Sequence, residues 1–269
     1  MRNKLAIFWS FLKLEFSVMA QYRIEMALWA LWGIAYPAVA IAAWGAAAAA
    51  GAEFGSIKGF GAHEFAAYFL LTMIVGHCVA AWDLYEMGAM VQSGSMSPKL
   101  MRPVLPVWEH LAANLGFKFL TLALLLPLWV VVALVTKPTA NVTLNGLFLG
   151  TIATVLGASV NFLWGYALGL SAFWLTRTEG ISETWFSAGL FFGGRMAPLT
   201  LLPVSLQWVA AVLPFKWVVW FPTSVLMGHL TGIEIVQGLF MQTLWLAGGL
   251  CVFPWMWRQS MKRYAAVGG

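Results

Sequence analysis

The sequence predicts an all-helical membrane protein, and three observations lead to this prediction. Of the 269 residues, 61% are hydrophobic and 9% are charged, whereas soluble domains average about 45–50% apolar and about 25% charged residues. The mean hydropathy is +0.82. Several apolar runs exceed the roughly 18–20 residues that cross a bilayer as a helix. Such long runs exclude a transmembrane β-barrel, whose strands alternate in short segments, and the composition excludes disordered, fibrous and disulfide-scaffold classes.

Residues 1–22 are predicted to form an amphipathic helix that lies in the membrane interface on the cytoplasmic side. In a helix, Leu5, Leu12 and Met19 share an apolar face, and Lys13 lies on the opposite, polar face. The segment is not read as a signal peptide, because polar residues break its apolar run and no small-residue cleavage site follows.

Six apolar spans are predicted, within a single transmembrane permease-like domain over residues 1–269. They cover residues 24–50, 64–84, 111–135, 144–175, 181–198 and 233–257. With the N-terminus inside, all but four of the 15 Lys and Arg residues fall on the inner side; the four outer ones are Lys58, Lys137, Arg195 and Lys216. The positive-inside rule therefore places both termini in the cytoplasm.

Residues 199–232, before the last span, are apolar but interrupted by prolines. Proline breaks helices, and broken backbone at membrane depth must be covered by protein or line a cavity. This segment is predicted to be a re-entrant helical hairpin that covers the outer end of a pathway, with a seventh, kinked span as the alternative. The residues assigned to this gate are Pro203, Leu213, Pro214, Phe215 and Pro222, with the tight turn at residues 213–215.

The chain lacks the phosphate loop that ends in GK[ST], and it lacks HExxH, GxSxG and CxxC motifs. No residue is therefore assigned to catalysis or to a metal. The excess positive charge is typical of cytoplasmic loops, so nucleic acid is not expected as a partner and the lipid bilayer is. Ionisable residues are nearly absent from the centres of the spans, which disfavours a gradient-driven carrier.

Candidate residues for a substrate path are large aromatic and charged side chains within the spans. They are Trp29, Trp32, Trp164, Glu183 and Arg195. The tryptophans either line a cavity for an apolar, aromatic or flat cationic cargo or pack against lipid. Glu183 is expected to be a buried acid that either pairs with Arg177 or gates the cargo.

Glycine pairs four residues apart occur at Gly146/Gly150, Gly165/Gly169 and Gly189/Gly193. This spacing lets helices approach closely. The pair Gly189/Gly193 is expected either at an interface between two subunits or at a contact within one subunit.

The last third of the chain and the loop after the second span carry a recognisable pattern. It reads Gly193-Gly194, Ala197-Pro198-Leu199, Leu202-Pro203, Leu213-Pro214-Phe215, Phe221-Pro222, Gly228, Gly238-Leu239, Gln242, Trp245, Arg263-Tyr264 and Gly268-Gly269, and in the loop Ser93-Gly94-Ser95 and Lys99-Leu100-Met101-Arg102-Pro103. This pattern resembles the six-span permeases of the ABC-2 type transporter family. Arg195 departs from it, because the family more often has an apolar residue after the Gly-Gly pair.

The resemblance implies a fold like that of type V exporters, in which two identical or related permease subunits form a dimer in the cytoplasmic (inner) membrane. It implies that separate ABC ATPase subunits use ATP and Mg, whereas this chain binds no cofactor and is not an enzyme. The segment 85–110 would carry a coupling helix that docks on the ATPase, although its residues alone favour a solvated connector. The residues assigned to coupling are Gly94, Ser95, Pro98, Lys99, Leu100 and Arg102, with Lys99 and Arg102 expected to meet acidic residues of the ATPase.

The sequence therefore favours the membrane subunit of an ABC exporter that moves a hydrophobic or amphipathic molecule, such as a drug, an aromatic cation or a lipid-like molecule. Two alternatives belong to other classes. One is a gradient-driven carrier or channel that acts without an ATPase, and the other is a structural membrane subunit without a transport path.

Overall fold

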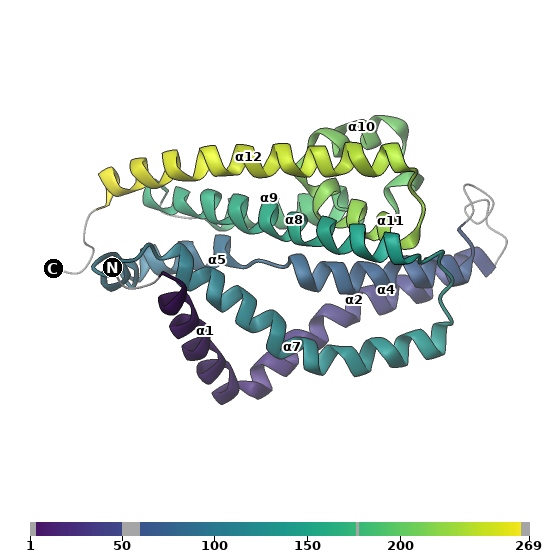
Figure 1. The fold of residues 1–269 in the computed structure, drawn as a ribbon, viewed down its shortest axis with the longest axis horizontal. Helices are drawn as coiled ribbons and strands as arrows, with labels where there is room; N and C mark the ends of the chain where they lie inside the picture. The colour runs from purple at the N-terminus through teal and green to yellow at the C-terminus, as the bar shows by residue number, and fades with distance from the viewer. Residues whose placement is uncertain (1–3, 50–59, 176–177, 265–269) are drawn as a thin grey trace.

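The computed structural model describes residues 4–49, 60–175 and 178–264, and within these ranges every regular element is a helix. The helices are α1 (Lys4–Gln21), α2 (Arg23–Ala49), α4 (Ala62–Val79), α5 (Asp83–Gln92), α6 (Met96–Leu100), α7 (Val107–Thr136), α8 (Leu144–Gly169), η1 (Leu170–Phe173), α9 (Glu179–Phe192), η2 (Leu199–Leu201), α10 (Val204–Val212), η3 (Lys216–Trp220), α11 (Phe221–Met227) and α12 (Gly232–Arg263). Figure 1 shows α1 and α5 at one end of the molecule and α10 and α11 at the other, with the end of α12 on the α1 side.

Four segments of the described chain are long and apolar enough to cross a membrane: Ala62–Gln92, Val107–Thr136, Leu144–Phe173 and Gly232–Arg263. A fifth is added if the bent pair formed by α10 with η3 and α11 counts as one span. The helix α2 covers the first predicted span, and its part Ile34–Ala49 is a shorter apolar helix. The structure thus confirms a multi-pass helical membrane protein, while the number of six spans stays a prediction.

The fifth predicted span is shorter in the structure than residues 181–198. The helix α9 has 14 residues and is followed by Gly193 and Gly194. Gly194 has φ +74°, a left-handed conformation that favours glycine. At 1.5 Å per residue, α9 rises only about 21 Å, less than the roughly 30 Å of the hydrocarbon core. The turn that carries Arg195 lies against Gly76, inside the apolar segment Ala62–Gln92, and the placement of Arg195 on the outer side stays a prediction.

The second predicted span is also not one continuous helix, because residues 80–82 separate α4 from α5. A break of this kind leaves backbone carbonyls without helical partners, which is costly inside a membrane. Asn161 Nδ2 donates to the carbonyl of Val79 at 2.9 Å, and Asn114 Nδ2 donates to the carbonyl of Ala80 at 3.1 Å. The contact of Asn161 thus joins α8 to α4.

The proline-rich segment 199–232 forms two helices bent by 86° at residues 213–215. Pro203 directly precedes α10, and Pro222 occupies the first turn of α11, where a missing backbone N–H costs little. Trp217 Nε1 donates to the carbonyl of Ala211 at 3.0 Å, so one side chain ties the two helices together across the bend.

The predicted and observed helices of this segment agree in part. The chain turns at residues 213–215 as expected, between α10, which ends at Val212, and the π-helix η3, which begins at Lys216. The bend fits a re-entrant hairpin and a broken span equally.

Glycines let the bent pair pack closely on its neighbours. A Cβ at Gly157 of α8 would lie 2.8 Å from the backbone oxygen of Val218, and a Cβ at Gly238 of α12 would collide with the ring of Phe221. The pair Gly189/Gly193 lies against Phe215 of the same chain, which is the contact within one subunit. These glycines therefore decide how deeply η3 and α11 insert between α8, α9 and α12.

Replacing Gln242 by leucine should lower the stability of the protein by about 1–3 kcal/mol, the cost of leaving buried polar groups unpaired. Gln242 is fully buried on α12, and its Nε2 donates to the carbonyls of Ala153 at 2.8 Å and Trp217 at 2.7 Å. The variant should unfold at a lower temperature than wild type in a thermal melt in detergent. Gln259→Leu, at a half-buried position on the same helix, is the control; an equal loss there would contradict this reading.

Candidate functional site

A short helix, α6, is held against the end of α5 by its own connecting loop. Gly94 has φ +73°, which lets the chain reverse after Gln92. The hydroxyl of Ser95 donates back to the carbonyl of Met90 at 3.4 Å. Pro98 is the third residue of α6, within the first turn, where a backbone N–H has no helical partner to lose. Part of segment 85–110, which the sequence analysis treats as the loop after the second span, is helix α5.

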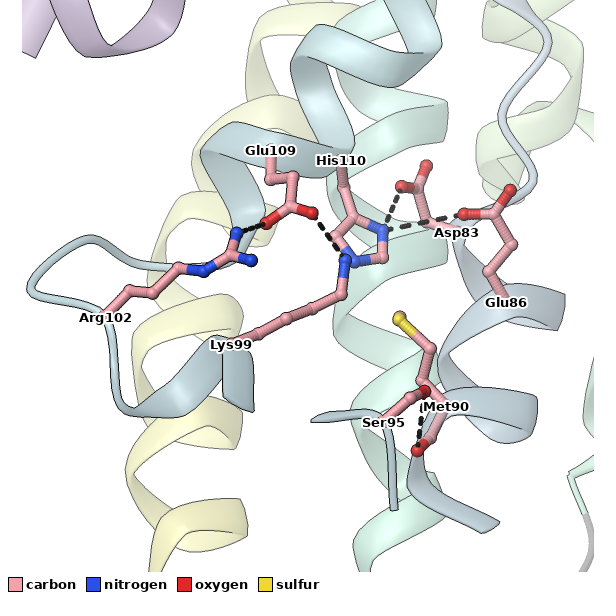
Figure 2. A network of polar contacts seen from close by, with 8 residues as sticks. All are labelled: Asp83, Glu86, Met90, Ser95, Lys99, Arg102, Glu109 and His110. Atoms are coloured by element: carbon pink, nitrogen blue, oxygen red, sulfur yellow. Dashed lines mark hydrogen bonds and ion pairs between the residues drawn. The ribbon is translucent and has the colours of Figure 1, made fainter. Parts of the chain in front are cut away.

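Glu109, in the first turn of α7, binds both cations of this loop. Lys99 Nζ lies 2.7 Å from Glu109 Oε1, and Arg102 Nη1 lies 2.8 Å from Glu109 Oε2 (Figure 2). The Glu109 side chain is only 14% exposed, whereas that of Arg102 is 49% exposed. Charge-assisted hydrogen bonds of this length are the strong ones. Sequence reasoning missed Glu109, although an acid shortly after two cations was a signal available to it.

His110 follows Glu109 directly and faces the other side of α7, toward α5 (Figure 2). Its Nδ1 lies 3.2 Å from Asp83 Oδ1 and 3.7 Å from Glu86 Oε2. The side chains of His110 and Asp83 are each 3% exposed. The His110 ring also meets the ring of Tyr166 edge-on at 5.3 Å. Two adjacent residues of α7 thus join α6 on one side to α5 and α8 on the other.

Asp83, Glu86 and His110 each offer a ligand atom, and these atoms lie within 4.8 Å of one another. One imidazole and two carboxylates are a donor set that suits a divalent transition metal. The hydrogen bond between His110 and Asp83 accounts for the same arrangement without an ion. Sequence reasoning assigned no metal ligands and missed this group, because His110 lies 27 residues from Asp83 along the chain.

The N-terminal helix α1 packs on α7 next to these residues. A Cβ at Gly116 of α7 would lie 3.5 Å from Glu15 Cβ, 3.7 Å from Met19 Sδ and 3.8 Å from Leu12 Cδ1. Burial raises the pKa of the Glu15 carboxyl above its usual value, and the negative charge of Glu109 raises it further. We call the ion-paired side chains that join α5, α6 and α7 the α6 network (Lys99, Arg102, Glu109, His110, Asp83 and Glu86). The helix α1 packs on α7 beside this network.

The residues proposed for a substrate path have separate surroundings. Trp164 Nε1 donates to the carbonyl of Trp245 at 2.9 Å, so this ring packs against α12. Glu183 is exposed, and the expectation that it is buried was wrong; α9 is too loosely packed to cover it. Arg177 lies outside the described residues, as do the side chains of Trp29 and Trp32.

Arg195 is the path candidate that the structure places against a neighbouring span. A Cβ at Gly76 of α4 would lie 3.8 Å from the guanidinium Cζ of Arg195. Within the described residues, no ion pair joins Arg195 to Glu183, and the Trp164 indole binds Trp245 instead.

No curated protein matches the chain in sequence. A family model described as ABC-2 family transporter protein matches residues 21–268. The match spans every helix from α2 to α12, including the α6 network and the bent pair. It agrees with the resemblance seen in the glycines and prolines of the last third of the chain, and with the multi-pass helical architecture. The chain belongs to the ABC-2 family of membrane transporter proteins.

Proposed function

We propose that the chain is the transmembrane permease subunit of an ATP-driven exporter in the inner membrane. It pairs with a second copy or with a related permease, and separate ABC ATPase subunits use ATP and Mg on its behalf. Both termini lie in the cytoplasm. The cargo is a hydrophobic or amphipathic molecule, of a drug, aromatic cation or lipid-like class. Membership of the ABC-2 family supports the role of a membrane transport subunit.

The single observation that carries the coupling role is the double ion pair of Glu109. A short helix transmits force only if it is fixed to the span that moves. Lys99 and Arg102 fix α6 to the start of α7, a helix of 30 residues. Because Arg102 is half exposed and a guanidinium has five N–H donors, it can bind an acidic residue of the ATPase while it keeps Glu109.

In the proposed cycle, ATP binding closes the ATPase dimer and displaces α6, with Gly94, Ser95 and Leu100 as the further residues of the docking element. The displacement passes through Glu109 to α7 and through His110 to α5. The two permeases rock, and the cargo leaves between them. The bend at Leu213, Pro214 and Phe215 covers the outer end of the path.

Purification of the complex tests this function. The tagged chain, expressed with its natural partners and purified, should carry an ATPase, and the reconstituted complex should move a fluorescent amphiphile only when ATP is supplied. Rhodamine 6G serves as the probe for aromatic cations and a fluorescent phospholipid as the probe for lipid-like cargo. Movement by the chain alone under an imposed proton or sodium gradient would instead support the carrier or channel and overturn the proposal.

A further inference from the structure

The turn that carries Arg195 is held in place by two spans. The hydroxyl of Tyr68, on α4, donates to the carbonyl of Gly194 at 2.5 Å. The indole Nε1 of Trp44, on α2, donates to the carbonyl of Met196 at 3.1 Å. The carbonyls of the residues on both sides of Arg195 are therefore bound by α4 and α2. These two hydrogen bonds fix the backbone from which the Arg195 side chain extends.

The guanidinium of Arg195 lies next to a glycine of α4. It is next to Gly76, where a Cβ would lie 3.8 Å from Cζ and from Nη1. Tyr68, Thr72 and Gly76 are spaced four residues apart, so they share one face of α4. Tyr68 and Gly76 both meet the α9 turn, and Thr72 lies between them. Its hydroxyl is buried and has no hydrogen-bond partner within the described residues.

Arg195 has no acidic partner in the part of the chain that the structure describes, where the ion pairs involve Lys99, Arg102 and His110. Two other helical cations, Lys118 and Lys216, also have no ion pair with an acid among the described residues. Lys118 donates to Asn114 Oδ1 at 2.6 Å, and Lys216 lies 4.8 Å from the ring centre of Trp217. A charge at membrane depth is costly unless it is paired, and such charges mark substrate or ion pathways.

Exposed apolar side chains lie along α9 and directly after Arg195 in the chain. Ser182 is the one buried residue of α9, and the side chains of Phe186 and Met196 are 45% and 44% exposed. Arg195 itself is only partly buried. A guanidinium presents parallel N–H donors that match a carboxylate or a phosphate. A cation bordered by exposed apolar side chains suits a molecule with one anionic group and an apolar body.

We infer that Arg195, assisted by Thr72, binds the carboxylate or phosphate of an anionic amphiphile, so that the cargo is anionic and not an aromatic cation. This inference rests on the proposed function and narrows its cargo class. The guanidinium packs on α4 at Gly76, where an added Cβ would meet it at van der Waals distance, and the Thr72 hydroxyl, on the same face of α4, supplies a further donor to the anion.

The test is a binding measurement on the purified chain in nanodiscs of phosphatidylcholine, without any ATPase. The probes are 11-(dansylamino)undecanoic acid, a carboxylate, and its methyl ester, which has nearly the same apolar body and no charge. Wild type should bind the acid at least fivefold more tightly than the ester. Arg195→Gln should remove this preference, Arg195→Lys should keep part of it, and Arg263→Gln, at an exposed arginine of α12, should leave it intact. Dodecyl phosphate as a competitor then separates phosphate from carboxylate recognition.

Equal binding of acid and ester by wild type would overturn the inference, whether or not any variant folds. So would a preference that survives in folded Arg195→Gln, since the charge would then be recognised elsewhere. An acidic residue of a second subunit that neutralises Arg195 would also give equal binding. If wild type prefers the acid but the complex shows no ATP-driven transport, the anion site at Arg195 is supported and the exporter proposal is overturned. The two proposals can therefore fail separately.

Discussion

Arg102→Glu should lower ATP-driven transport at least tenfold while the chain still inserts into the membrane. The change places a second carboxylate where Arg102 now lies 2.8 Å from Glu109. Repulsion would detach the end of α6 from α7, so movement of α6 would no longer reach the span. Stability should change little, because pairs with an exposed partner contribute about 0.2–1 kcal/mol.

Transport and ATP hydrolysis should be measured together on the reconstituted complex, since uncoupling lowers the number of molecules moved per ATP and not only the rate. Arg102→Lys should retain most of the transport, because one ion pair to Glu109 survives. Arg258→Glu places the same charge change on the exposed end of α12 and serves as the control. Normal transport by Arg102→Glu, or an equal loss with Arg258→Glu, would remove the coupling role of this pair.

Gly157→Ala should destabilise the protein by about 1–3 kcal/mol, the usual cost of forcing extra atoms into a packed interior. The added Cβ would lie 2.8 Å from the carbonyl oxygen and 3.3 Å from the Cα of Val218. Both atoms belong to the backbone of η3, so no side chain can rotate away. The variant should unfold several degrees below wild type in a thermal melt.

The matched control is Gly165→Ala, two turns further along the same helix. A Cβ there meets no atom within 4 Å, so the substitution should leave stability unchanged or raise it, because alanine favours helices over glycine by about 1 kcal/mol. A similar loss of stability in both variants would contradict the prediction, because the close contact between Gly157 and η3 would then not be the cause.

Much of the architecture could be read from the sequence. The apolar spans that became α7, α8 with η1, and α12 were predicted within a few residues, because span length follows directly from the thickness of the bilayer. The prolines correctly marked the bend at Pro214, since proline cannot continue a helix without losing a hydrogen bond. The family pattern of glycines and prolines was confirmed over residues 21–268.

Other features were not predictable from local patterns. The break at residues 80–82 is tolerated because Asn114 and Asn161, from two other helices, supply the missing donors. The length of α9 depends on Gly194, which turns the chain where Tyr68 can bind its carbonyl. Neither feature is visible in an apolar run, because each depends on a partner far away in the sequence.

The sequence by itself determined that this is a helical membrane protein of the ABC-2 family, with helices in a known order and a broken segment before the last span. Composition and the length of apolar runs suffice for the helical membrane class, because the bilayer accepts few other structures. The pattern of glycines and prolines carries the resemblance to the family, which the family model confirms. The tertiary structure alone decided where the scarce charges lie. Glu109 holds Lys99 and Arg102 on α6, and Arg195 rests on Gly76 with no acidic partner among the residues that the structure describes. Those choices depend on contacts between distant residues, and apolar periodicity carries no information about them.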